Sequence, residues 1–161
     1  PPARRNTAMS IFKSLGHVAL RVNDLDRSVA FYNAIGFPEV LRLLNKEGKP
    51  WIVYHRVSDD LYVELFPGGD GPVSPPEKTG LMHLCLTVED IDVAEAKLAE
   101  AGIQLMRPRN PGRGIDGNRG MWIADPDGNQ IEIMEMAPNC IQYEAERAVL
   151  AGGKPHVLSL S

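Results

Sequence analysis

The sequence predicts an α+β fold built from two tandem βαβββ modules. This prediction rests on two motifs that each occur twice in the chain. A stretch that reads His-x-x-Leu-x-Val-x-Asp-(Leu/Ile)-Asp begins at His17 and occurs again at His83. A second motif, an apolar strand pattern with a central glutamate, occupies 62–66 and returns at 130–134. The histidines lie 66 residues apart and the central glutamates 68 apart. Such similar offsets indicate two copies of one supersecondary unit.

The first module is predicted over residues 14–66. Alternating apolar residues predict a strand over 14–22. Asp24-Leu25-Asp26 offers acceptors for the first free amides of a helix, which runs to a glycine stop at Gly36. The remaining strands of the module are predicted at 40–44, 51–57 and 61–66.

The second module, residues 81–137, is predicted to repeat this order after a Pro- and Gly-rich linker at 67–80. Its helix is expected over 90–101, with a stop at Gly102. Its strands are expected at 83–88, 104–107, 121–124 and 130–136, with a polar loop at 109–120 and a tight turn at 125–128. We expect 1–13 to be a loose tail around a natural start at Met9, and 138–161 to be a C-terminal tail with an amphipathic helix at 141–150.

The composition is that of an ordinary soluble domain. The 161 residues are 43% hydrophobic and 24% charged, and the formal net charge of −4 argues against nucleic-acid binding. No apolar run approaches the roughly 18 residues that span a bilayer. The two cysteines give no disulfide framework, and Cys85 is expected to pack in the core or line a pocket. We therefore expect a cytoplasmic protein with no membrane or nucleic-acid partner.

The repeat puts four potential metal ligands, His17, Glu64, His83 and Glu132, at matching positions. Each lies on the face of its strand opposite the Val/Leu/Ile stripe. One such residue alone is more often solvated or paired with a surface charge, but the recurrence of all four favours a shared site. Two imidazoles and two carboxylates suit an octahedral divalent ion such as Ni, Co, Mn, Fe or Zn, with water completing the shell. The four side chains meet only if the sheets curve into a concave surface.

These motifs resemble those of the vicinal-oxygen-chelate superfamily, which includes glyoxalase I, extradiol dioxygenases and antibiotic-resistance proteins. The resemblance covers residues 15–135 and is most specific at 125–133, Asp-Pro-Asp-Gly-Asn-Gln-Ile-Glu-Ile. It implies two βαβββ modules that form a cupped mixed sheet around a divalent metal. It also implies a homodimer in which strands of both chains build each site.

The complete set of four ligands is most similar to that of bacterial glyoxalase I. This resemblance implies a lyase or isomerase that moves a proton on an α-oxygenated carbonyl substrate through a metal-bound enediolate, with glutathione as a possible co-substrate. By position, Glu132 is the candidate base and Glu64 its partner across the metal. The chemistry needs the cation, because a carboxylate is too weak a base unless the enediolate oxygens are stabilised.

Three arginines are candidate substrate-binding residues. Arg21 corresponds to an arginine that binds glutathione in glyoxalase I, although the asparagine expected shortly after Glu64 is replaced by Pro67-Gly68-Gly69. Arg113 and Arg119 lie in the glycine-rich loop at 107–120. That loop is interpreted either as a lid whose arginines bind a carboxylate or phosphate, or as a solvated surface loop.

Other functions of the superfamily stay open. An epimerase acting beside a carbonyl uses the same proton transfer and differs only in its pocket. An extradiol dioxygenase holds iron with two His and one Glu and usually has four modules, so the present chain fits it less well. Fosfomycin-type thiol transferases use three ligands, and antibiotic-sequestering proteins keep the cup but lose the ligands. The four ligands retained here argue against both.

Overall fold

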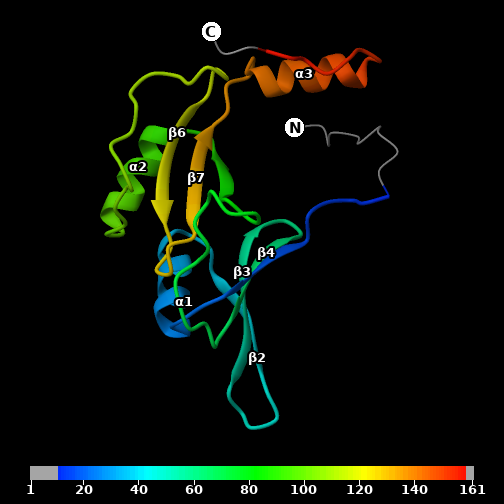
Figure 1. Ribbon diagram of the computed structural model, residues 1–161. Helices are drawn as coiled ribbons and strands as arrows, with labels where there is room; N and C mark the ends of the chain where they lie inside the picture. Colours follow the sequence, from blue (N-terminus) through cyan, green and yellow to red (C-terminus); the bar gives the residue numbers. More distant parts are fainter. Residues whose placement is uncertain (1–10, 159–161) are drawn as a thin grey trace.

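The computed structural model describes residues 11–158, so most of the expected N-terminal tail lies outside the described residues. Within this range the chain forms strands and helices in the order expected from the sequence, with one exception described below (Figure 1). The elements are β1 (His17–Arg21), α1 (Leu25–Ala34), β2 (Glu39–Leu44), β3 (Pro50–Ser58), β4 (Leu61–Phe66), β5 (Leu84–Val88), α2 (Ile91–Glu100), β6 (Arg119–Ala124), β7 (Gln130–Glu135) and α3 (Ile141–Leu150).

The strands form two mixed sheets with the orders β1-β4-β3-β2 and β5-β7-β6. In both sheets the first strand of the module runs parallel to the last, which pairs antiparallel with the strand before it. Glu64 in β4 pairs with Ala19 in β1 and Tyr54 in β3. Glu132 in β7 has the equivalent neighbours in β5 and β6. The matching registers confirm the repeat and the α+β fold class.

The strand expected at 104–107 is the exception, because the structure forms no strand there. The Met106 N–H donates to the Trp122 carbonyl at 2.8 Å, so this segment does run beside β6. Proline at 108 has no N–H, and residue 108 would donate the next hydrogen bond of a ladder. The second sheet therefore has three strands where the first has four.

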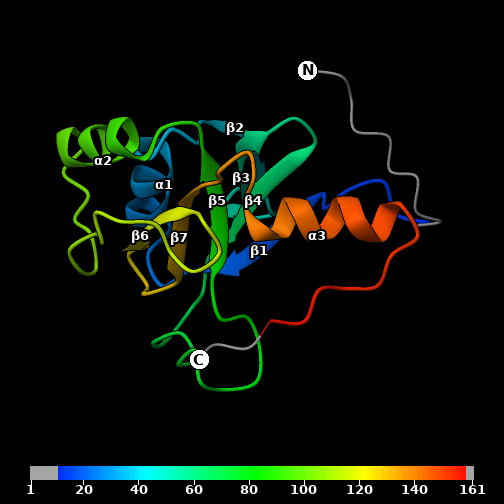
Figure 2. The same ribbon diagram turned by 90° about the horizontal axis from the view of Figure 1, so that it is seen from above.

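The helices begin and end where the sequence predicts. Asp24 caps α1 by accepting from the Arg27 N–H at 3.0 Å, and Asp90 caps α2 in the same way. Both helices stop just before a glycine in the left-handed region, Gly36 with φ +95° and Gly102 with φ +75°. Figure 2 shows α1 and α2 on the same side of the molecule, with α3 apart from them.

One hydrophobic core is shared by the two modules. The apolar strand faces of both sheets and the inner faces of α1 and α2 contribute to it. Its buried members include Leu20, Tyr32, Val53, Leu65, Ile91, Met121, Ile123 and Ile131. Each sheet thus turns its apolar face to the core and carries the candidate ligands on the opposite face, where Glu64 is buried.

The turn between β6 and β7 fastens the second module to the region of α1. The Tyr32 hydroxyl donates to Asp125 Oδ2 at 2.9 Å, and Asn23 Nδ2 donates to Asp127 Oδ1 at 2.9 Å. Asp125 is buried and also accepts from the Asn129 backbone and side chain, so its carboxylate is fully bonded. Burial and the Asp125 charge raise the pKa of Tyr32. The turn at 125–128 therefore also joins the two modules.

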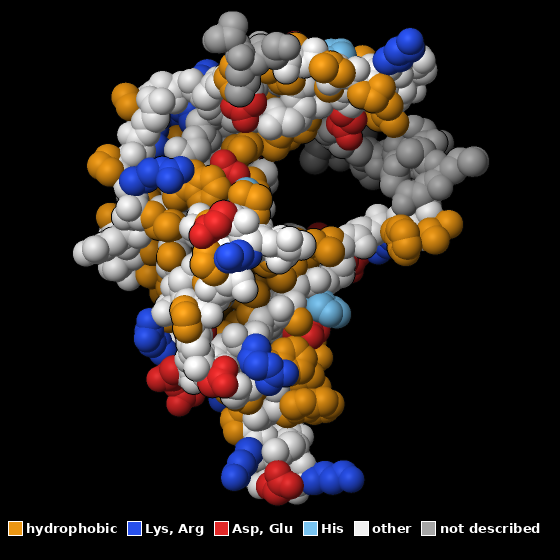
Figure 3. All heavy atoms as spheres, viewed as in Figure 1, with side chains coloured by type: hydrophobic (Ala, Val, Ile, Leu, Met, Phe, Trp, Pro, Cys, Tyr) orange, Lys and Arg blue, Asp and Glu red, His pale blue; other side chains and the backbone are white. Residues whose placement is uncertain are grey.

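Two parts of the chain project from the body. The β2–β3 hairpin extends away from the rest in Figure 1, and α3 spans the opposite end. Large apolar side chains lie exposed on the hairpin, as Figure 3 shows for this face; they include Val40, Leu41, Leu44 and Trp51. Among the described residues, no helix has the length and apolar character that a membrane crossing requires.

Candidate metal centre

His17 and Glu64 form a first pair. His17 begins β1, the outer strand of the first sheet, and Glu64 lies in the neighbouring strand β4. The His17 Nδ1 and Glu64 Oε1 atoms are 3.4 Å apart. The Glu64 side chain is 10% exposed and that of His17 is 56% exposed, so the imidazole borders solvent. We call this pair the first half-site.

His83 and Glu132 form a second, equivalent pair, which we call the second half-site. His83 immediately precedes β5, the outer strand of the second sheet, and its Nε2 lies 3.3 Å from Glu132 Oε2. Trp122, the β6 neighbour of Glu132, packs against the His83 imidazole, with 4.9 Å between ring centroids and an interplanar angle of 73°. The tryptophan therefore orients the imidazole beside its glutamate.

Each half-site has the spacing of two adjacent metal ligands. Ligand atoms about 2.1 Å from an octahedral ion lie about 3 Å from each other. N–H···O hydrogen bonds are usually shorter than the 3.3–3.4 Å seen in these pairs. Among residues 11–158, however, no three His, Cys, Asp or Glu side chains come together to hold a metal. One chain thus presents two half-sites, while the four predicted ligands do not meet within it.

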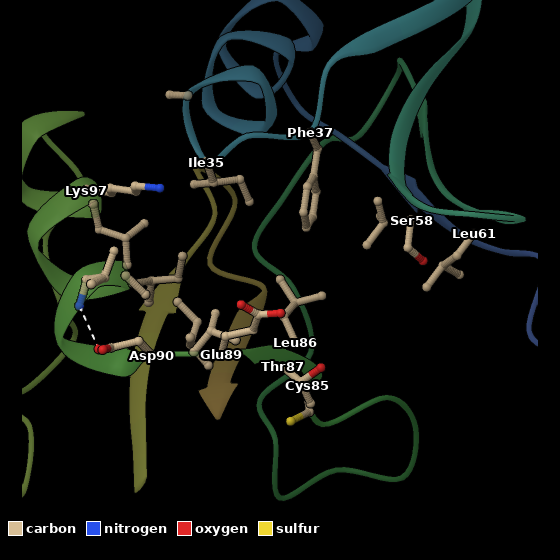
Figure 4. Close-up of a pocket in the computed structure, with 18 residues that line it drawn as sticks. Ile35, Phe37, Ser58, Leu61, Cys85, Leu86, Thr87, Glu89, Asp90 and Lys97 are labelled. Atoms are coloured by element: carbon tan, nitrogen blue, oxygen red, sulfur yellow. Dashed lines mark hydrogen bonds between the residues drawn. The ribbon is translucent and has the colours of Figure 1, made fainter. Parts of the chain in front are cut away.

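A cavity of about 740 Å³ lies between the modules, along the edge of β5 with which no described strand pairs (Figure 4). Phe37 and Leu61 of the first module lie across it from Cys85 and Leu86 of β5. None of the four candidate ligands lines this cavity. It is mainly apolar and leaves one edge of the second sheet accessible.

Cys85 lines this cavity, as the sequence suggested, and pairs with Glu132 across the sheet. Although the residue is partly exposed, local burial and the Glu132 carboxylate raise the pKa of its thiol to about 11. At neutral pH Cys85 is therefore a protonated thiol, which is a poor nucleophile.

Comparison with known proteins identifies the family. The family model of the Glyoxalase/Bleomycin resistance protein/Dioxygenase superfamily matches residues 14–133. The chain belongs to this superfamily. The match covers both half-sites and most of the two modules, so the motif-based resemblance is confirmed.

Individual members of the superfamily are similar to this chain in sequence and in structure. The uncharacterized protein YwkD of Bacillus subtilis is 30% identical over 128 residues, which cover 78% of this chain and 98% of YwkD. A lactoylglutathione lyase of Salmonella typhimurium is 29% identical, with 74% and 90% of the two chains covered. The crystal structure of a glyoxalase family protein from Enterococcus faecalis aligns with a TM-score of 0.67 at 27% identity, covering 78% and 100%.

In this superfamily member, two of the three candidate substrate-binding arginines donate to carbonyl groups. Arg21 Nη1 donates to the Pro67 carbonyl at 2.9 Å, next to the linker that replaces the expected asparagine. Arg113 Nη1 donates to the Gly117 carbonyl at 2.9 Å within its own loop. Both guanidinium groups are in exposed residues and have further N–H donors beyond these bonds.

Arg119, the third candidate, is held in ion pairs. Its guanidinium bonds both Glu135 in β7 and Asp92 in α2, and Arg109 bonds Asp92 as well. The Arg119 hydrogen bond, together with the Ile91 N–H, holds the pKa of Glu135 below its usual value. Arg119 also lowers the pKa of Asp92. This network joins α2 to the second sheet, so Arg119 has a structural role in this arrangement.

Trp122, which contacts His83 of the second half-site, was not predicted from the sequence, and Arg107 was included only as one of the arginines of the loop at 107–120. The guanidinium carbon of Arg107 lies 5.2 Å from the centroid of the Trp122 ring. Trp122 could have been predicted from the sequence, because counting residue pairs outward from the turn at 125–128 places it opposite Glu132. The sequence does not distinguish Arg107 from the other arginines of that loop, because its place depends on how the segment after α2 returns to β6.

Proposed function

We propose that the protein is a divalent-metal-dependent lyase or isomerase of the glyoxalase type, which moves a proton between neighbouring carbons of an α-oxygenated carbonyl substrate. The observation that carries the proposal is the presence of two equivalent His–Glu pairs, each with the spacing of adjacent ligands. The relative named lactoylglutathione lyase supports the reaction class.

The proposed centre is shared between two copies of the chain, the first half-site of one facing the second half-site of the other. His17 and His83 lie on or beside strands whose outer edges pair with no other strand of residues 11–158, and such edges readily pair with another chain. Leu15 and Leu81, each two residues before a histidine, are 64% and 59% exposed. A homodimer that joins these edges would cover both leucines and supply four ligands to each of two sites.

The four ligands divide the proposed chemistry. All four would hold the ion, and Glu132 would also take the carbon-bound proton of the substrate and return it to the adjacent carbon. A divalent ion held there supplies positive charge that stabilises the oxyanion formed as the proton leaves. The Trp122 ring packs against the His83 imidazole and keeps it in position.

The test is equilibrium metal binding followed by a substrate comparison. The purified protein is expected to bind one Ni²⁺ or Co²⁺ per chain and then to convert methylglyoxal. Assays with and without glutathione distinguish a glutathione-dependent lyase from a related isomerase. A wild-type protein that binds no divalent ion would overturn the proposal.

A further inference from the structure

A row of side chains crosses the second sheet and ends at Arg107. Glu132 in β7 pairs with Trp122 in β6, whose ring touches the His83 imidazole. The guanidinium of Arg107 lies over the same indole, 5.2 Å from the ring centroid. The hydrogen bond from the Met106 N–H to the Trp122 carbonyl fixes the segment that carries this arginine beside β6. Arg107 is therefore held on the Glu132 face of the sheet.

This row borders a cavity of about 260 Å³. Arg107, Trp122 and Glu132 line it together with Asn110 and Met134. The volume is just below the usual range for sites that hold drug-sized ligands, so it suits a smaller molecule, and its walls combine polar and apolar surface. A small ligand that reaches Glu132 within this cavity would therefore also meet Arg107.

The other arginines of the cavity wall are already neutralised. Arg109 Nε donates to Glu95 at 2.8 Å, and Arg119 is paired with Glu135. For Arg107, by contrast, the structure records no bonded carboxylate within residues 11–158; its recorded contact is the Trp122 ring. A guanidinium that lies over an aromatic ring still has N–H donors available for a planar oxyanion.

We propose that Arg107, positioned by Trp122, binds a carboxylate or phosphate group of the ligand that occupies this cavity. This rests on the proposed function in one respect: the ligand is taken to be the substrate, which thereby becomes an anionic α-oxygenated carbonyl compound. The sequence singled out Arg113 and Arg119 of the loop at 107–120 as substrate-binding residues. The structure favours Arg107 of the same loop instead, because Arg119 is ion-paired with Glu135.

The test uses Trp122 as a reporter in metal-free protein. A Trp51→Phe background leaves Trp122 as the sole tryptophan. Fluorescence is titrated with inorganic phosphate and, separately, with succinate, at constant ionic strength set by chloride. We expect a saturable signal with at least one anion. Arg107→Gln should weaken this binding about tenfold or more, and Arg107→Lys should weaken it less, because the charge remains but the fork is lost.

Arg42→Gln is the matched control, since it removes the same charge from the distant strand β2 and should leave the titration unchanged. Saturation by phosphate alone assigns a phosphorylated ligand, and saturation by succinate alone assigns a carboxylate. No saturation with either anion, or equal affinity in Arg107→Gln, overturns the proposal. Because the protein is metal-free, failure of metal binding would defeat the proposed function while leaving this result standing.

Discussion

At the residue scale, the function depends on carboxylates that sit beside imidazoles on otherwise ordinary strands. Glu64 and Glu132 occupy equivalent registers, and each lies within 3.4 Å of a histidine nitrogen. Both pairs are on the sheet face opposite the side chains of the shared core. The two glutamates differ in their neighbours, because Trp122 and the anion-binding candidate Arg107 are next to Glu132.

Glu132→Gln tests the role of the proposed base. The amide keeps the shape of the side chain and one oxygen for a metal, but it cannot accept a carbon-bound proton. We expect turnover to fall by about two to four orders of magnitude, while thermal stability without metal stays near that of the wild type. Steady-state kinetics and thermal unfolding give the two values. Unchanged turnover would assign the base to another group.

The four ligand residues could be selected from the sequence, because the repeat marks them twice. Their separation into two half-sites depends on the tertiary packing of the modules, so only the family resemblance, and not the residues themselves, implied a site built from two chains. The partners of Arg119 were also hidden: Glu135 and Asp92 are 16 and 27 positions away along the chain. A loop arginine in a glycine-rich segment therefore looked available for substrate although it is ion-paired.

At the element scale, capping residues account for the successful predictions. Asp24 and Asp90 start the helices and Gly36 and Gly102 stop them, and all four are visible in the sequence. The strand expected at 104–107 failed because an apolar pattern alone does not guarantee a partner ladder. Short apolar segments of this kind are the weakest predictions from periodicity.

Arg119→Met tests the ion-pair network that joins α2 to β6 and β7. Because the folded-state pKa of Glu135 is below its ordinary value of 4.5, the network stabilises the fold above that pH and loses its contribution as pH falls through the lowered pKa. We expect the melting temperature to drop by a few degrees at pH 7 and the difference from wild type to narrow below pH 4.5. Thermal scans across this range measure it. A pH-independent difference would contradict an electrostatic role.

At the scale of the whole molecule, the joint between modules depends on the buried bond from Tyr32 to Asp125. Tyr32→Phe removes one donor, but Asp125 keeps its Asn129 bonds, so we expect a loss of about 1 kcal/mol in the free energy of unfolding. Urea denaturation measures the change. In an Asp125→Asn background the same substitution should cost less, and equal costs in both backgrounds would show that the two residues are not coupled.

Exposed leucines before the two histidines identify the surface expected to join two copies. Leu15→Asp and Leu81→Asp should each weaken dimerisation at least about tenfold, since a buried unpaired carboxylate is costly. Leu44→Asp changes a similarly exposed leucine on the β2–β3 hairpin and is the matched control. Light scattering across a concentration series gives the dimer fraction. A wild-type protein that stays monomeric would contradict the dimer itself.

Metal binding by mixed chains tests the shared centre most directly. One variant carries His17→Gln and Glu64→Gln, and the other carries His83→Gln and Glu132→Gln. Neither alone should bind Co²⁺ at its centre. After co-refolding, random pairing makes half of the dimers mixed, and each mixed dimer has one intact site, so about a quarter of the wild-type metal content should return. No recovery in mixtures shown by native mass spectrometry to contain mixed dimers would contradict a centre built from both chains.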